Sequence, residues 1–143
     1  MEKSTLNKKE VLAKLDKILE SELSGVIRYL HYSFMIFGPN RIPITKWFRD
    51  HATEGFNHAT IIGEKITALG GHPSIKAKPV PETNQHTVME ILTESLEYER
   101  ETLTQYYDLL AHCTSDVALE EMVRKQISDE TAHIEEVEKM IRK

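Results

Sequence analysis

Residues 47–73 have the sequence WFRDHATEGFNHATIIGEKITALGGHP, a long helical segment followed by a strong stop signal. His51, Glu54 and His58 recur at i, i+3 and i+7, so a helix places all three on one stripe. The two glycines near the end predict a left-handed helix cap, and the proline after them prevents continuation of the helix. The stretch therefore predicts a long helix with an acid–histidine face.

Three further segments also have the periodicity of helices. The first opens with Asn7 and Glu10, an N-x-x-E capping signal, and carries apolar residues at helical spacing. Thr87 and Glu90 form the same kind of signal before the third helix, and the fourth begins at Ser115 or Asp116. We expect helices over about residues 7–37, 43–69, 87–113 and 115–143.

The connection between the second and third helices, residues 72–86, is the only long one. It contains three prolines and has no helical period. A second helix of about 27 residues is roughly 40 Å long, and about 15 extended residues can reach nearly 50 Å. The connection can therefore run the length of the bundle and make the second and third helices parallel. Together with two short loops, this predicts an all-α four-helix bundle with one long crossover between helices two and three.

An acid–tyrosine–histidine pattern occurs once in each half of the chain. Seven positions separate each first glutamate from its tyrosine, and 36 or 34 positions separate it from the later histidine. The two sets are Glu22, Tyr29, Glu54 and His58, and Glu99, Tyr106, Glu130 and His133. Carboxylates are almost never buried unless they are paired or bound to metal. If the four helices form one bundle, these side chains meet at its centre, and the duplicated pattern predicts a site for two metal ions.

Composition limits the other function classes. The chain has 143 residues, enough for a single domain over residues 1–143, and its net charge of −5 argues against nucleic-acid binding. Cys113 is the one cysteine, which excludes an intrachain disulfide and a Cys-x-x-Cys metal site. Residues 1–10 lack the apolar core of a signal peptide, and no apolar run is long enough to span a membrane. We expect a cytoplasmic protein.

The four segments ELSGVIRYLHYSF (22–34), WFRDHATEGFNHATIIGEKITALGGHP (47–73), LEYERETLTQYY (96–107) and SDETAHIEEVEKM (128–140) resemble bacterioferritins and related ferritin-like di-iron carboxylate proteins. The resemblance covers nearly the whole chain and implies a ferritin-like fold. It also implies an iron site, with Glu22 and His58 holding one iron, Glu99 and His133 the other, Glu130 bridging, and Tyr29 and Tyr106 packing beside the metals.

This sequence departs from the family pattern in helix two. The family has a second bridging glutamate three residues before the histidine, where this chain has Gly55. Glu54 stands one position earlier and has two alternative roles. It either orients His133, as Asp129 would orient His58, or swings in to replace the missing bridge. A site with weakened metal affinity is the third alternative.

Two further departures concern haem and assembly. Phe56 stands where bacterioferritins have the haem-binding methionine, so no haem is expected. The chain ends about ten residues after His133, which leaves no sequence for the family's fifth helix. We expect a homo-oligomer, either a dimer or another closed assembly, rather than the familiar 24-subunit shell.

Our first functional hypothesis is ferroxidase activity, in which ferrous iron is oxidised by oxygen or peroxide for storage or detoxification. Carboxylates and imidazoles suit iron or manganese, with two ions per chain, or one if the site is impaired. The expected catalytic residues are Glu22, His58, Glu99, Glu130 and His133, with Glu54 as a further metal ligand. The alternatives are a di-metal redox enzyme of the peroxidase kind, and a non-catalytic metal-binding bundle. The intrasubunit duplication argues against the class of DNA-protecting miniferritins.

Overall fold

The computed structural model describes residues 6–143 and contains four helices and no strand within that range. The helices are α1 (Lys8–Phe34), α2 (Arg41–Ala68), α3 (Val88–Leu110) and α4 (Val117–Ile141). The all-α prediction is confirmed. The expected domain, residues 1–143, includes five residues outside the described range, and its extent stays a prediction.

Side-chain caps begin three of the helices where the sequence predicts. Asn7 Oδ1 accepts a hydrogen bond from the Glu10 amide at 3.2 Å, and Thr87 forms a complete capping box with Glu90. Asp116 caps α4 by accepting from the amide of the third helical residue at 3.0 Å. Each cap satisfies a backbone amide that has no partner within its helix.

The first helix ends at Phe34, three residues earlier than the expected Phe37. Gly38 adopts a φ of +106°, which turns the chain towards α2. The guanidinium of Arg41 donates to the carbonyl oxygens of Ser33 and Ile36 at 3.3 and 2.6 Å. These bonds satisfy carbonyls that a longer helix would have bonded internally, so the turn replaces the predicted last turn of α1.

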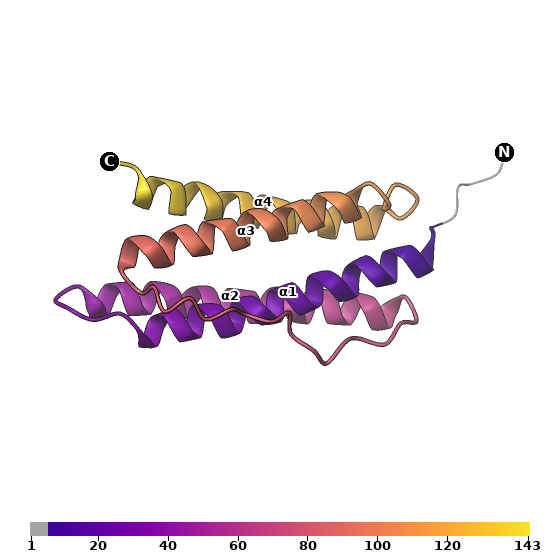
Figure 1. The fold of residues 1–143 in the computed structure, drawn as a ribbon. Coiled ribbons are helices and arrows are strands. Elements are labelled where there is room, and N and C mark those ends of the chain that lie inside the picture. Colours follow the sequence, from indigo (N-terminus) through magenta and orange to yellow (C-terminus); the bar gives the residue numbers. More distant parts are fainter. Residues whose placement is uncertain (1–5) are drawn as a thin grey trace.

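The helices form two antiparallel pairs, α1 with α2 and α3 with α4 (Figure 1). The segment between α2 and α3 runs back along the whole bundle, so α3 points in the same direction as α2. It lies against α1, where the amide of Lys78 donates to the Glu20 carbonyl at 3.0 Å and the amide of Ser74 donates to Asp16 at 2.9 Å. The predicted long crossover is confirmed.

The helix α2 stops as the glycine pair predicts. Gly70 has a φ of +85°, its amide bonds to the Thr67 carbonyl, and the Gly71 amide bonds to the Ile66 carbonyl at 2.9 Å. This double pattern is a Schellman cap, which needs a left-handed residue that glycine adopts without a Cβ clash. The crossover therefore begins directly after Gly71, at the C-terminal end of α2.

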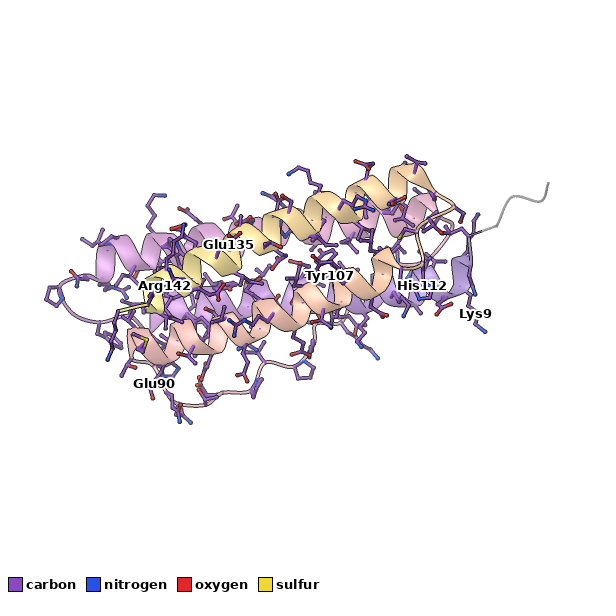
Figure 2. All side chains as sticks on the ribbon, turned by 90° about the horizontal axis from the view of Figure 1, so that it is seen from above. Lys9, Glu90, Tyr107, His112, Glu135 and Arg142 are labelled. Carbon is purple, nitrogen blue, oxygen red and sulfur yellow. The ribbon has the colours of Figure 1, made fainter. Side chains whose placement is uncertain are left out.

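Two apolar clusters form the core, and side chains fill the space between the helices along its length (Figure 2). One cluster is built around Leu15, Ile62 and Leu119, and the other around Tyr32, Phe48 and Val137. The buried polar side chains, Glu22 and Glu130 among them, come from the same helices. No helix within residues 6–143 has the length and apolar character needed to cross a bilayer.

Candidate metal centre

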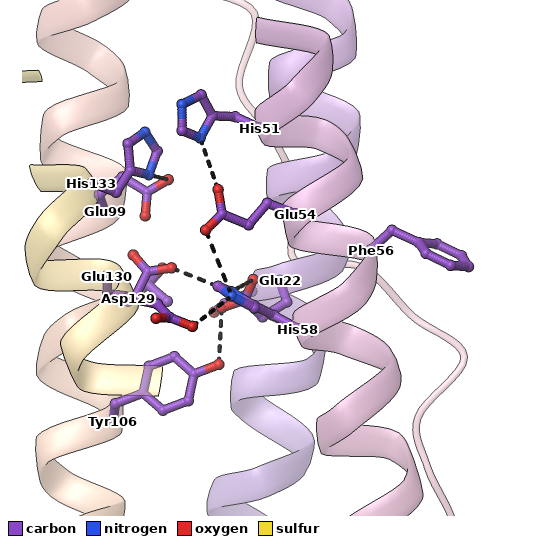
Figure 3. Close-up of polar contacts among 12 residues, drawn as sticks. Glu22, His51, Glu54, Phe56, His58, Glu99, Tyr106, Asp129, Glu130 and His133 are labelled. Carbon is purple, nitrogen blue, oxygen red and sulfur yellow. Dashed lines mark hydrogen bonds and ion pairs between the residues drawn. The ribbon is translucent and has the colours of Figure 1, made fainter. Parts of the chain in front are cut away.

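Five of the six predicted site residues meet inside the bundle, one from each of α1, α2 and α3 and two from α4 (Figure 3). Their side chains are nearly closed to solvent, with 2–8% of each residue exposed. The five residues are Glu22, His58, Glu99, Glu130 and His133. Burying three carboxylates together is costly without a counter-charge, so the arrangement calls for a cation.

The donor atoms fall into two groups that share Glu130. Nδ1 of His58 lies 3.6 Å from a Glu22 oxygen and 3.7 Å from a Glu130 oxygen. Nδ1 of His133 lies 3.4 Å from a Glu99 oxygen. Within each group, the candidate donor atoms all lie within 4.8 Å of one another. The groups are Glu22, His58 and Glu130, and Glu99, Glu130 and His133, and each of them could hold a metal ion.

Several candidate donor atoms of this centre have no hydrogen-bond partner. Among residues 6–143, Oε2 of Glu99, Oε2 of Glu130 and Nε2 of His133 are buried and have no hydrogen-bond partner. Buried polar atoms are normally paired, and each orphan costs about 1–3 kcal/mol. Hard carboxylate oxygens and imidazole nitrogens are donors that suit iron or manganese. The residues present therefore fit a metal ion.

Two tyrosines connect the halves of the centre crosswise. The hydroxyl of Tyr106, on α3, donates to Glu22 on α1 at 3.0 Å. The hydroxyl of Tyr29, on α1, donates to Glu99 on α3. Each tyrosine thus holds the carboxylate of the opposite helix, which fixes the direction of that carboxylate towards the centre.

The pKa values of the Glu99 and Glu130 carboxyls shift in opposite directions. Burial raises the pKa of Glu130 well above its ordinary value, and the charge of Glu99 raises it further. Burial also opposes ionisation of Glu99, but hydrogen bonds from Glu130 and His133 outweigh it and lower the pKa of Glu99 to about 2. Glu130 is therefore the member of the pair that holds a proton more tightly, and a bound cation would compete with that proton.

The Glu22–His58 pair follows the same logic. Burial raises the pKa of the Glu22 carboxyl, against the hydrogen bond and charge of His58. Burial alone would lower the pKa of His58, but the hydrogen bond to Glu22 outweighs it, and the pKa lies above its ordinary value. Protons and metal ions compete for these groups, so metal affinity must rise with pH.

The sixth predicted residue, Glu54, lies at the edge of the centre. Its Oε2 is 3.2 Å from Nδ1 of His51, its Oε1 is 3.9 Å from Nε2 of His58, and 43% of its side chain is exposed. It belongs to neither donor group. His51 occupies the position beside His133, because the two imidazoles stack with ring centres 3.8 Å apart and nearly parallel planes. Glu54 therefore contacts His51 and His58 instead of His133.

The outer nitrogen of His58 faces two carboxylates, because Asp129 lies 3.8 Å from the same Nε2 that faces Glu54. This contact agrees with the expected orienting role of Asp129. Nδ1 of His58 therefore faces the centre, and Nε2 faces the two outer carboxylates. Phe56 points away from the centre and is exposed (Figure 3).

Gly55 lines the same cavity as the two donor groups. A Cβ on Gly55 would lie 3.4 Å from Cγ2 of Val26 and 3.6 Å from the Glu22 carbonyl oxygen, which are ordinary contacts. The glycine is therefore not required by crowding, and its effect is to leave one side of the centre without a carboxylate.

Sequence reasoning missed two residues of the centre. The hydroxyl of Tyr98 donates to the Ser21 carbonyl at 2.6 Å and lies over Gly25, where an added Cβ would be 2.3 Å from the hydroxyl oxygen. Gly25 is therefore required by the close approach of Tyr98. The clue in the sequence is a glycine one turn after Glu22, within an otherwise uninterrupted helix.

Comparisons with known proteins agree with this architecture. The family model of the ferritin-like domain matches residues 12–143. A bacterial ferritin from Paramagnetospirillum magnetotacticum is 26% identical over 106 residues, which cover 74% of this chain and 64% of that protein. The chain thus spans less than two thirds of the length of that curated relative.

Solved structures have the same fold. A ferritin-like, diiron-carboxylate protein from Bacillus anthracis is 26% identical, with a TM-score of 0.90 over 97% of this chain and 100% of that one. The Rhodobacter capsulatus bacterioferritin is 24% identical, with a TM-score of 0.84 over 96% of this chain and 86% of that one.

Proposed function

Because the chain belongs to the ferritin-like family, we propose that it binds two ferrous ions in the bundle and oxidises them, for iron storage or detoxification. The observation that carries the proposal is the pair of buried donor groups sharing Glu130. The likeness to the diiron-carboxylate protein from Bacillus anthracis supports iron as the substrate. The likeness to the bacterial ferritin supports storage as its purpose.

Dioxygen is the proposed oxidant. Two ferrous ions each lose one electron, dioxygen gains two electrons and two protons, and the products are two ferric ions and hydrogen peroxide. Glu22 and His58 would hold one ion, Glu99 and His133 the other, and Glu130 would bridge them. Three carboxylates favour the ferric product because they are hard anions. Peroxide is the alternative oxidant, and manganese the alternative metal.

The chain's own groups supply binding and proton movement. Glu130 would release its proton as the ions enter, because its carboxylate is then stabilised by cations in place of a hydrogen bond to Glu99. Tyr29 and Tyr106 would keep the two terminal carboxylates aimed at the ions. The apolar clusters on the same helices would limit the entry of bulk water.

An anaerobic titration with ferrous ion, followed by exposure to air, tests the proposal. We expect a near-ultraviolet ferric absorption that saturates near two irons per chain. Glu130→Ala should abolish oxidation above the rate in buffer, because it removes the donor common to both groups. Glu135→Ala is the matched control, since Glu135 is an exposed glutamate of the same helix (Figure 2). Oxidation by the wild-type chain at the buffer rate would exclude ferroxidase activity.

A second candidate function is metal binding without catalysis. Gly55 favours it, because it leaves Glu130 as the one carboxylate common to both donor groups. In that case the titration should saturate at one iron per chain, and air should oxidise the bound iron no faster than free iron.

Homo-oligomerisation is part of the proposal, and native mass measurement tests it. A large closed particle would favour storage, and a dimer would favour redox chemistry.

A further inference from the structure

A second cluster of metal-ligating side chains lies on the outer side of α1, away from the bundle centre. His31 projects from α1, and Glu82 and His86 come from the crossover that runs beside it. Nε2 of His31 is 2.7 Å from one oxygen of Glu82, and Nε2 of His86 is 3.1 Å from the other. We propose that these three residues bind one divalent transition-metal ion that fastens the crossover to α1.

The three donors have the composition and spacing of an open zinc site. Two imidazoles and one carboxylate are a ligand set of catalytic-type zinc centres, in which water takes the fourth position. Donors about 2.1 Å from a tetrahedral ion are about 3.4 Å apart. The donor atoms of His31, Glu82 and His86 lie within 4.8 Å of one another, so shifts of about 1 Å bring them onto one ion.

A simple ion pair explains the cluster less well. Among the described residues, Nε2 of His31 has no hydrogen-bond partner, although a Glu82 oxygen is only 2.7 Å away. The ring nitrogen is therefore not directed at that oxygen as a hydrogen-bond donor would be. Exposed ion pairs also contribute about 1 kcal/mol or less, which is a weak reason for three long side chains to converge.

Helix α1 and the start of α3 position two of the three donors, and a turn positions the third. His86 immediately precedes the Thr87 cap of α3, and His31 sits inside α1. The amide of Asn84, which has a φ of +58°, donates to Glu82 at 2.8 Å and holds the carboxylate between the two rings. The ordering cost that a metal must overcome is therefore small, because backbone elements already place all three donors.

Zinc provides the test, because it binds imidazole well and is not oxidised. The number of zinc ions bound by the full-length metal-free chain is measured by equilibrium dialysis and elemental analysis. We expect His31→Gln and His86→Gln each to bind one zinc fewer per chain than wild type. His112→Gln is the matched control, since His112 is a partly exposed histidine 3.5 Å from the single carboxylate of Glu10. It should bind as many zinc ions as wild type.

The intrabundle centre contributes equally to all four proteins, so the difference between them tests this site alone. If the intrabundle centre binds no metal, the number of zinc ions per chain falls equally in all four proteins. If the outer cluster binds no metal, wild type and the His31 and His86 variants bind the same number of zinc ions. Equal counts in His86→Gln, His31→Gln and wild type would overturn it. So would an equal loss in His112→Gln.

Fastening of the crossover is measured by tryptic cleavage after Lys76. At zinc concentrations about 100 times the dissociation constant, opening of the crossover should become up to about 100-fold rarer in wild type. The same zinc should not slow cleavage of His86→Gln to that degree, because only the intrabundle centre remains. Equal protection of the two proteins would show that the ion does not join the crossover to α1.

Discussion

Replacing Gly55 by glutamate tests whether a missing carboxylate limits the metal centre. The position faces the cavity lined by Glu22, His58 and Glu130, and an added Cβ meets only ordinary contacts, the nearest at 3.4 Å. Gly55→Ala is the control for the backbone, because it adds the Cβ without the carboxylate. Alanine should stabilise the helix by about 1 kcal/mol whether or not metal is present.

Gly55→Glu should have opposite effects on the metal-free and the metal-bound chain. Without metal it adds a further acid beside three buried carboxylates, so the free energy of unfolding should be lower than for Gly55→Ala. With metal, two unit charges 4 Å apart attract by about 4 kcal/mol at an effective dielectric constant of 20. Desolvation of the new carboxylate removes part of that gain. We expect ferrous ion to bind at least about tenfold tighter, or about 1.4 kcal/mol.

The assay is anaerobic calorimetric titration with ferrous ion at one pH, with urea unfolding of the metal-free chains alongside. The comparison that matters is Gly55→Glu against Gly55→Ala, because both variants replace the helix-destabilising glycine and add a Cβ. If the two variants bind ferrous ion equally tightly, the absent carboxylate does not limit affinity, and our reasoning about Gly55 is refuted.

Three other perturbations follow from the same geometry. Glu54→Ala should weaken ferrous binding about 10–100-fold and leave the number of bound ions unchanged, because Glu54 contacts His58 from outside the donor groups. Loss of one ion per chain in the titration would show that Glu54 is a ligand. The metal-free chain should lose stability as pH rises above the ordinary pKa range of a glutamate, because the raised pKa of Glu130 lets the folded chain keep a proton that the unfolded chain releases. Urea unfolding in the presence of chelator should show a smaller pH-dependent loss of unfolding free energy for Glu130→Gln than for wild type. Equal losses in the two proteins would contradict the raised pKa of Glu130. Gly25→Ala should lower the free energy of unfolding by about 1–3 kcal/mol, because its Cβ would lie 2.3 Å from the Tyr98 hydroxyl; an unchanged urea midpoint would mean that Tyr98 moves aside freely.

Most of the fold could be predicted from local patterns. Caps at Asn7, Thr87 and Asp116, together with the glycine cap after α2, marked helix ends to within a few residues. The direction of the crossover was predicted from the number of residues between α2 and α3, which is enough to span the length of the bundle. Two helices end three residues early, α1 at Phe34 and not at Phe37, and α3 at Leu110 and not at Cys113. The error for α1 arose because Arg41 satisfies carbonyls at the turn through contacts that sequence spacing does not encode.

The centre was predictable as a set of residues but not as a set of contacts. Helical spacing of 3.6 residues per turn placed Glu130 and His133 on one face, and the repeated pattern identified the acids of the other helices. Which atoms face one another depends on how the helices rotate and cross. That rotation directs Glu54 towards His51 and lays Tyr98 over Gly25.

The amino-acid sequence alone therefore specified four helices, their order and direction, and the residue types available for a metal centre, because these properties depend on neighbours within a few turns. The tertiary structure decided the pairings between distant segments, such as Tyr29 with Glu99 and His31 with Glu82. The physical reason is that contacts between helices arise from the packing of whole side-chain faces, which no local stretch of sequence specifies.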